Sequence, residues 1–513
     1  MTDTAAAAAE SADTARLRAG RRRLAVVLLL LCWIALAGWI AWRLAGKAQD
    51  DFFITYRYAW NLAAGQGFVF NPGERVFGTT EPGLGLLLAG LALLTRQEIP
   101  ALGTAVTAAA LVGIAALLLL GAARRGQRRQ LHRLPEAAVG GTLLLSSTFL
   151  WANHGAGAFP ALLLLLLAAR LGPERPLLSG LAAGLAVWVR PDAAVGTGIL
   201  GLLLWGERRR LPWIYGFVAG ATIGLGALWA TWVLGSPLPN TLLAKHAMAV
   251  ASPGGPVGAA FWPRALPLLY RHVGDWWLYA VLLGALGQVP LLRSGDRAAR
   301  LLSLFGLTLV VLYPVLKVPF FPWYSVPVAV ALLYGVAAAA GALGRRLPGA
   351  LGPAAALALL SPVLFTLLPA GWQWLQAYDW YPHLKSYREA ALYLHQRSQP
   401  NDAIAYVEIG VLAYYSRQPV DDLLGLVTPA VLPYVEKNDL PGAFLLKPTP
   451  WVAYHTRGRM GPLLDRRWFW NAYEDVAHFK DPGGDGELTL FHRRPGSALP
   501  ESLPPGMGKW NRR

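Results

Sequence analysis

The chain passes from its first apolar run into the segment DDFFITYRYAWNLAAGQGFVFNPGERVFGTTEPGLGLLLA, residues 50–89. Asp50 and Asp51 open this segment, and aromatic residues at helical spacing follow them as far as Gly65. The pattern predicts a short helix over residues 52–64 that stops at the glycine. The apolar stretch 83–94, of about 12 residues, is too short to cross a bilayer and fits an interfacial helix.

On both sides of this segment the chain has the composition of a membrane protein. Of its 513 residues, 55% are hydrophobic and only 15% are charged, and the mean hydropathy is +0.39. Uncharged runs such as 24–42, 99–123 and 211–244 reach the roughly 20 residues that cross a hydrocarbon core. The first run is too long for a removable signal peptide and lacks a cleavage site, so we expect it to stay as an anchor.

About eleven apolar segments are predicted to span the membrane. They centre near residues 33, 110, 145, 163, 182, 200, 223, 284, 309, 334 and 360. We therefore expect an all-α membrane bundle over residues 24–371, preceded by a basic tail over 1–23. The composition changes at about Trp372, and residues 372–513 contain no further span.

The net charge of +17 comes from short basic clusters between the apolar runs. Because these clusters do not form one soluble face, they argue against nucleic acid as a partner. They satisfy the positive-inside rule if they face the cytoplasm. The clusters are 16–23, 124–133, 170–175, 208–210, 293–300 and 345–346. That assignment places the N-terminus inside, and the first loop, 47–98, and the C-terminal domain outside.

The C-terminal residues predict a small α/β domain. A helical pattern over 387–397 is followed by an apolar strand over 403–407 and a helix over 409–415, with further strands near 451–454 and 487–492. The single cysteine, Cys32, lies in the first span, so neither a disulfide framework nor a cysteine-based metal site is available.

The acidic pair at the head of the first loop has two candidate roles. Asp50 can cap the helix that follows, and Asp51 can favour the positive end of its dipole. Alternatively, a carboxylate at the membrane surface can take a proton from an acceptor hydroxyl, or hold a divalent cation against a leaving phosphate. The pair alone does not decide between these roles.

The segment 50–89 resembles the first periplasmic loop of the GT-C-type membrane glycosyltransferases, most of all the arabinofuranosyltransferase-like branch. Further similar segments follow in order over nearly the whole chain: RPD at 190–192, GSPLPNTLLAK at 235–245, PWY at 322–324 and EIGVLAYYSRQPVDDLLGLVTP at 408–429. The resemblance implies transfer of an arabinofuranosyl or hexosyl unit from a polyprenyl monophosphate donor. The acceptor would be a cell-envelope glycan, lipid or protein, outside a bacterial cytoplasmic membrane.

The resemblance also implies that an acidic residue of the first loop is essential. This role carries over to Asp51 and Asp50, as a base or as ligands of a divalent cation such as Mg, Mn or Ca. The chain departs from the family pattern at two places. It reads GAGA at 155–158, where relatives often have Gly-Met-Glu-Thr, and Thr-Glu-Pro at 80–82, where relatives often have Thr-Asn-Pro. These departures leave the acceptor and the exact donor open.

A lipid-linked donor agrees with the absence of a GxxxxGK[ST] loop and of a Rossmann fingerprint from the sequence. Its phosphate requires cations near the outer headgroup level. Arg190, Lys245 and His246 lie at predicted outer span ends or loops and are candidates for that contact. Snorkelling to the membrane interface is the alternative role for Arg190 and Lys245.

The other substrate-binding candidates are polar or aromatic residues of the outer loops: Tyr56, Arg57, Glu81, Asn240, Trp323 and Tyr324. Glu81 is preferred to Glu74 because it precedes the interfacial helix. Asn240 can orient a sugar hydroxyl or cap a turn. Trp323 and Tyr324 can stack on a sugar ring or an isoprenoid, or belong to the aromatic belt.

Some polar residues are interpreted more simply as structural. His154, a lone histidine near a glycine-rich bend, is not assigned to catalysis. By the resemblance, Glu408, the pair Tyr414-Tyr415 and the pair Asp421-Asp422 would pack over the outer face and help bind the acceptor. The tyrosines also fit a core and the aspartates a strand end or helix start, so we expect no chemistry there.

Two other functions remain open at this stage. A transporter or flippase of lipid-linked sugars would show internal pseudo-symmetry, interrupted helices and ionisable residues near the middle of its spans, whereas the charges here lie at span ends. A non-catalytic scaffold for envelope assembly would leave the carboxylates, aromatics and glycines of residues 50–89 without a role.

Overall fold

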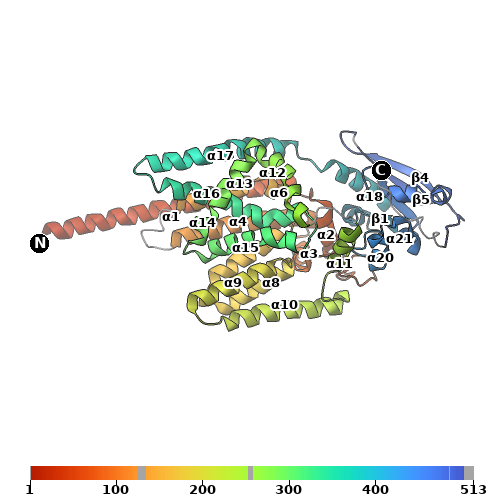
Figure 1. Cartoon of the computed structure of the whole chain (residues 1–513), viewed down its shortest axis with the longest axis horizontal. Coiled ribbons are helices and arrows are strands. Elements are labelled where there is room, and N and C mark those ends of the chain that lie inside the picture. Colours follow the sequence, from red (N-terminus) through yellow and green to blue (C-terminus); the bar gives the residue numbers. More distant parts are fainter. Residues whose placement is uncertain (1, 125–133, 252–257, 485, 502–513) are drawn as a thin grey trace.

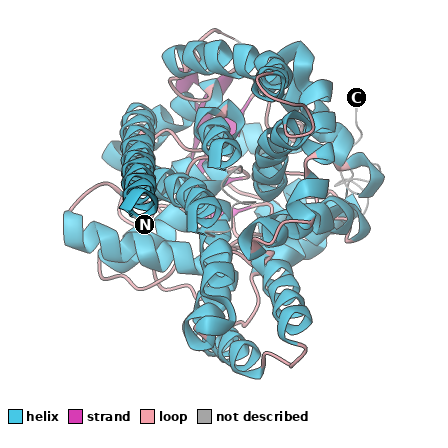
Figure 2. Cartoon of the chain, turned by 90° about the vertical axis from the view of Figure 1, so that its left-hand side faces the viewer, coloured by secondary structure: helices cyan, strands magenta, loops and turns pink. Residues whose placement is uncertain are grey.

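The structure is a computed structural model that describes residues 2–124, 134–251, 258–484 and 486–501. It has a helical bundle with a small sheet domain at one end (Figure 1). Viewed along the bundle from the N-terminal side, the helices stand in front and the strands lie behind them (Figure 2). Most of the expected basic cluster 124–133 lies outside the described residues.

Every expected span centre falls within a helix. The helices are α1 (Thr2–Leu44), α4 (Ile99–Arg124), α5 (Leu134–Ser146), α7 (Ala158–Leu171), α8 (Pro176–Val189), α9 (Ala193–Arg208), α10 (Trp213–Leu234), α13 (Trp277–Leu286), α15 (Arg297–Val315), α16 (Val326–Gly344) and α17 (Leu351–Ala377). Among the described residues, seven helical segments are long and apolar enough to cross a membrane. The fold class is therefore confirmed, while the number of eleven spans stays a prediction.

Small residues allow close helix packing inside the bundle. A Cβ atom at Gly287 would collide with the backbone of Gly335 on α16, and one at Gly284 would meet the backbone of Leu332. Such close approach is the usual way in which helices associate where lipid removes the hydrophobic drive between them. The outer helix α10 instead exposes large apolar side chains, among them Phe217 and Trp232, as a lipid-facing helix does.

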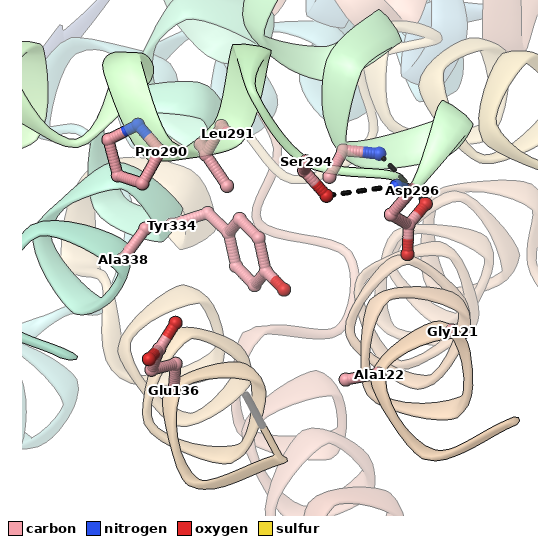
Figure 3. Close-up of a pocket in the computed structure, with 10 residues that line it drawn as sticks. Gly121, Ala122, Glu136, Pro290, Leu291, Ser294, Asp296, Tyr334 and Ala338 are labelled. Atoms are coloured by element: carbon pink, nitrogen blue, oxygen red, sulfur yellow. Dashed lines mark hydrogen bonds between the residues drawn. The ribbon is translucent and has the colours of Figure 1, made fainter. Parts of the chain in front are cut away.

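The described basic clusters 170–175, 208–210, 293–300 and 345–346 lie at the bundle end that is remote from the sheet (Figure 1). There Arg170 pairs with Asp296 at 2.8 Å, and Arg297 pairs with Glu207 at 2.8 Å. Asp296 also caps α15 and lines a small pocket with Glu136 (Figure 3). The arrangement agrees with one common face for these clusters. Their cytoplasmic location stays a prediction.

Short helices fill the space between the bundle and the sheet domain (Figure 1). The expected helix 52–64 is α2 (Asp50–Ala63), and the expected interfacial helix 83–94 is α3 (Pro82–Thr95). Other short elements connect the bundle helices, and α14 among them lies at the end remote from the sheet (Figure 1). They are α6 (Thr148–Ala152), η2 (Gly172–Glu174), α11 (Asn240–Ala251), η3 (Gly258–Ala260), η4 (Trp262–Ala265), α12 (Leu266–Val273), η5 (Gly274–Trp276), α14 (Gln288–Leu292) and η6 (Pro322–Ser325).

The C-terminal domain is a five-stranded mixed sheet covered by short helices. Its strands are β1 (Ile404–Tyr406), β2 (Val420–Asp422), β3 (Trp451–His455), β4 (Tyr473–Lys480) and β5 (Glu487–Arg493), in the order β2-β1-β3-β5-β4. β1 pairs in parallel with β2 and β3, and β5 pairs antiparallel with β3 and β4. The helices are α18 (Pro382–Arg397), α19 (Gly410–Ser416), η7 (Pro429–Val431), α20 (Leu432–Glu436), α21 (Leu440–Leu446), α22 (Gly461–Leu464) and α23 (Arg467–Ala472).

The predicted α/β domain is therefore confirmed, with two strands that the sequence pattern did not indicate. β2 is only three residues long and ends in two aspartates, and β4 is an edge strand with mostly exposed side chains. Neither has the apolar run or clean alternation by which strands are recognised. The last bundle helix, α17, continues past Trp372 to Ala377.

Candidate functional site

Asp50 joins the first loop to the C-terminal domain. Its two carboxylate oxygens accept hydrogen bonds from the backbone N–H groups of Gly410, at 3.0 Å, and Val411, at 2.7 Å. The expectation that Asp50 caps its own helix is wrong, because Gln49 occupies the cap position of α2 and makes no side-chain cap bond. Asp50 instead caps α19, a helix distant in sequence.

The neighbouring carboxylate of Asp51 is free. Within the described part of the chain it makes no hydrogen bond and no ion pair, and its side chain is half-buried. Burial raises the pKa of Asp51, Glu408 raises it further, and the positive charge of Lys245 opposes the rise. Successive helical residues point in different directions, which explains why only the first aspartate reaches α19.

A cavity of about 270 Å³ lies between the bundle and the C-terminal domain. Asp50 and Asp51 line it from α2, while His383 and Glu408 line it from the C-terminal domain. Arg271 of α12 lines it as well and forms no ion pair with a described residue. The volume approaches the roughly 300 Å³ at which small-molecule pockets begin.

Asp51 also lines a second, smaller space of about 30 Å³. Lys245 of α11 lines this space too, and its amine donates a hydrogen bond to the Tyr324 hydroxyl at 2.7 Å. The amine also lies 4.5 Å from the centre of the Phe321 ring. No carboxylate of the described residues pairs with Lys245, so a buried cation retains hydrogen-bonding capacity for a ligand.

Arg190 reaches the same region but is already neutralised. Its guanidinium pairs with Glu81 at 3.1 Å and with Asp192 at 2.8 Å, and it packs over the ring of Tyr324. Burial would lower the pKa of Arg190, but the two carboxylates hold it above its usual value. Glu81 also accepts the backbone N–H of Gly157 at 3.0 Å. The expected second carboxylate is thus part of a closed network.

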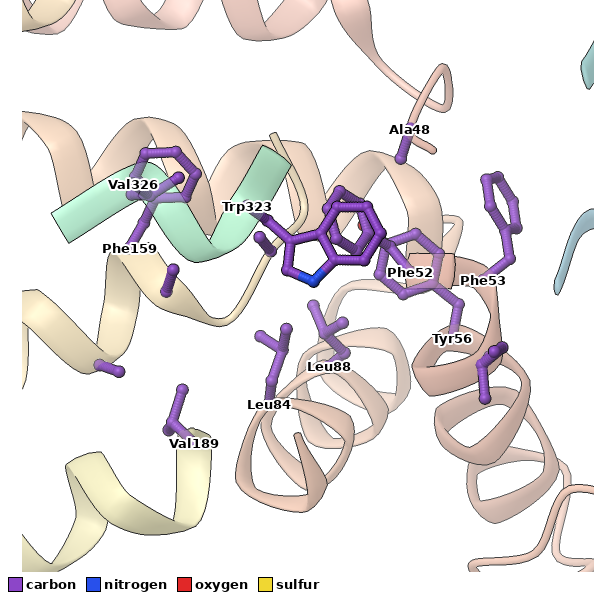
Figure 4. Packing of buried hydrophobic residues seen from close by; sticks show 14 of the residues in the cluster. Ala48, Phe52, Phe53, Tyr56, Leu84, Leu88, Phe159, Val189, Trp323 and Val326 are labelled. Carbon is purple, nitrogen blue, oxygen red and sulfur yellow. The ribbon is translucent and has the colours of Figure 1, made fainter. Parts of the chain in front are cut away.

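Trp323 separates the two cavities. It is buried, and it lines both of them together with Asp51. Its ring contacts Phe52 edge to face at 5.3 Å and stacks on Phe321 at 4.8 Å. Figure 4 shows it above Leu84 and beside Phe52 in the apolar cluster. This packing fixes the ring beside Asp51.

Four other expected residues lie elsewhere. His246 is on the exposed face of α11, opposite Lys245. The Asn240 amide donates to the carbonyl groups of residues 425 and 426, so it ties α11 to the C-terminal domain. Tyr56 is fully buried, and Arg57 is buried with bonds to the carbonyl groups of residues 70 and 417. None of the four lines either cavity at Asp51.

Several lining residues were not identified from the sequence, among them the histidine and the arginine that face the acidic pair in this cavity. His383 follows a proline at the start of α18, and Arg271 lies near the end of α12. Neither has a distinctive sequence context, and both reach Asp51 only through tertiary folding. Glu408 was expected in the C-terminal domain for acceptor binding, but its proximity to the acidic pair was not.

Comparison with known proteins identifies the fold. Residues 376–491 match a domain of unknown function, DUF8728, and no curated protein matches the chain. The crystal structure of ArnT from Cupriavidus metallidurans bound to undecaprenyl phosphate is similar, with a TM-score of 0.56, 14% identity, and coverage of 92% of this chain and 99% of that one.

The oligosaccharyltransferase AglB from Archaeoglobus fulgidus, in complex with an inhibitory peptide and a dolichol-phosphate, is also similar. Its TM-score is 0.54 at 11% identity, with coverage of 92% of this chain and 75% of that one. The chain therefore has the GT-C fold of polytopic membrane glycosyltransferases. With its apolar helices, this fold makes it a multi-pass membrane protein.

Proposed function

We propose that the chain is a membrane glycosyltransferase that uses a polyprenyl monophosphate sugar. An arabinofuranosyl or hexosyl unit would pass to a cell-envelope glycan, lipid or protein at the outer face of a bacterial cytoplasmic membrane. One observation carries the proposal. Asp51, whose carboxylate is unpaired, lines both a space that Lys245 also lines and a cavity that the C-terminal domain completes.

In this proposal Asp51 is the general base. It removes the proton from an acceptor hydroxyl while the new bond forms between that oxygen and the anomeric carbon of the donor sugar. The bond from the anomeric carbon to the phosphate oxygen breaks, and polyprenyl phosphate leaves with the bonding electrons. The raised pKa of Asp51 makes it a stronger base than an ordinary carboxylate.

Lys245 would hold the leaving phosphate. Its ammonium group offsets the negative charge that grows on the phosphate oxygens as the bond breaks. The space beside it, about 30 Å³, holds about one water molecule. A phosphate group is larger than this space, so donor binding must enlarge it. The undecaprenyl phosphate of the ArnT structure and the dolichol-phosphate of the AglB structure support a donor of this class.

Arg190 would act on the donor through Glu81 and Asp192 rather than by direct contact. Both carboxylates are within ion-pair distance of its guanidinium. The proposed contribution of this network is to fix the loop before α3 against the end of α8, which positions the wall opposite Lys245.

A divalent cation held by Asp50 and Asp51 does not fit the donor set. Each oxygen of Asp50 already accepts one backbone N–H bond, which leaves it a single lone pair and a fixed orientation towards α19. The described residues contain no group of three or more histidine, cysteine or acidic side chains that could hold a metal ion. We therefore derive no step through a cation.

The test is transfer by purified protein from defined polyprenyl-phosphate sugars to candidate acceptors. Asp51→Asn should lower kcat by about 10²- to 10⁴-fold, the usual contribution of a general base. Asp465→Asn, an exposed aspartate outside the site, is the matched control. Transfer at the wild-type rate by Asp51→Asn would refute the base. Wild-type protein that transfers from no donor would instead favour a transporter of lipid-linked sugars.

A further inference from the structure

One wall of the larger cavity comes from the C-terminal domain. Two side chains of that wall have hydrogen-bonding atoms without a partner among the described residues. Glu408 follows β1 and precedes α19, and His383 is the second residue of α18. Both belong to the segment that matches a domain of unknown function. The cavity therefore joins this domain to Asp51 in one space.

Glu408 is held in place from two sides. The hydroxyl of Tyr387 donates a hydrogen bond to its Oε2 at 2.7 Å. The backbone just after it is fixed because Gly410 and Val411 donate to Asp50. Its other oxygen, Oε1, has no hydrogen-bond partner among the described residues, and the side chain is exposed to the cavity. A fixed, solvated carboxylate of this kind can accept a hydrogen bond from a ligand hydroxyl.

His383 lies beside Glu408 on the same wall. Its ring contacts the Tyr387 ring edge to face at 5.6 Å. Neither ring nitrogen hydrogen-bonds to a described residue, so the imidazole can both donate and accept towards a ligand. His455, at a ring distance of 6.5 Å, is instead closed off by its bond to Asp481.

Carboxylates outnumber cations in the lining of the larger cavity. Asp50, Asp51 and Glu408 line it, with Arg271 as the only lysine or arginine in its described lining. An anionic ligand there would meet an excess of carboxylates in a partly desolvated space, which costs binding energy. A polyhydroxylated ligand without charge would meet acceptors for its hydroxyl groups and the buried face of Trp323.

We propose that Glu408 and His383 form the acceptor subsite of this chain and select an uncharged carbohydrate over an anionic one. Glu408 accepts a hydrogen bond from an acceptor hydroxyl beside the one that Asp51 deprotonates, and His383 bonds to the next. Asp50 is a positioning residue, since it holds α19 and so Glu408 against the site. The proposal rests on the proposed glycosyltransferase activity.

The test separates acceptor from donor. Initial rates are measured for wild type, Glu408→Gln and the control Glu389→Gln, an exposed residue on α18, with uncharged and uronic acid-bearing glycosides of matched size as acceptors. Glu408→Gln keeps an oxygen for the Tyr387 hydroxyl, so folding should be preserved. In Glu408→Gln we expect the KM for the uncharged acceptor to rise about 10-fold, because one charge-assisted hydrogen bond is lost. The donor KM should be unchanged.

Glu408→Gln should also reduce the ratio of initial rates with uncharged and anionic acceptors, because one charge that repels the anionic acceptor is removed. An unchanged acceptor KM in an active Glu408→Gln enzyme, or equal use of both acceptor classes by wild type, would overturn the proposal. Binding of an uncharged methyl glycoside to the protein without donor, followed by ligand-detected NMR, gives an independent readout. Wild type that binds the glycoside but transfers no sugar would refute the proposed function and leave the subsite standing.

Discussion

Replacement of Lys245 by methionine removes the cation of the smaller space beside Asp51, whose amine lies over the rings of Phe321 and Tyr324, and keeps a side chain of similar length. If the amine holds the donor phosphate, the lost interaction is a hydrogen bond between charged groups, which contributes about 1.5–3 kcal/mol. At about 1.4 kcal/mol per factor of ten, binding of the donor should weaken about 10- to 150-fold. The Tyr324 hydroxyl loses its partner but can bond to water in the vacated space.

The assay measures donor KM at saturating acceptor, together with the affinity of the sugar-free polyprenyl phosphate. Both should change by the same factor in Lys245→Met, and Lys245→Arg should recover part of the loss. Lys437→Met, an exposed lysine of the C-terminal domain, is the matched control. Wild-type affinity for polyprenyl phosphate in Lys245→Met, or a change confined to the acceptor KM, would refute the assignment.

Other perturbations test the framework around the site. Asp50→Asn keeps one acceptor for two backbone donors, so the free energy of unfolding should fall by about 1–3 kcal/mol and the melting temperature in detergent should fall with it. An unchanged melting temperature would contradict the role of Asp50 in holding α19. Arg190→Ala leaves Glu81 and Asp192 as buried, unpaired charges at a cost of about 3–5 kcal/mol, and size-exclusion chromatography should show aggregated protein, whereas a monodisperse variant would argue against the network. Burial raises the pKa of Asp421 from 3.8 to about 6, so the folded protein holds a proton that the unfolded chain has already released. The contribution of this group to the free energy of unfolding is fully present below about pH 4 and is lost as the pH rises through 6. The melting temperature should therefore fall less across this range in Asp421→Asn than in wild type.

The bundle was predictable because lipid imposes a simple rule on sequence. A chain that crosses a bilayer must satisfy its backbone within each helix and present apolar side chains outward. Apolar runs therefore mark the helices and basic clusters mark their ends. Each expected span centre lies in a helix. Boundaries were less predictable, as α17 shows by continuing into residues that look soluble.

The roles of individual polar residues depended on partners that are distant in sequence. Asp50 and Asp51 are adjacent and chemically identical. Asp50 accepts hydrogen bonds from the N–H groups of Gly410 and Val411, whereas Asp51 has no partner among the described residues. Lys245 is unpaired, while Arg190 is neutralised by the distant Glu81 and by Asp192, two residues along the chain. No local pattern distinguishes the two aspartates or indicates Glu81.

By itself, the sequence determined that this chain is a helical membrane protein with a C-terminal α/β domain, because hydrophobicity and periodicity are local properties. It also indicated the first loop as the place of the site. Only the tertiary structure decided which carboxylate of that loop is free, and that Glu408 and His383 face it across a cavity. The physical reason is that hydrogen bonds and ion pairs are made in space, so the state of a polar group depends on which distant partner folding brings to it.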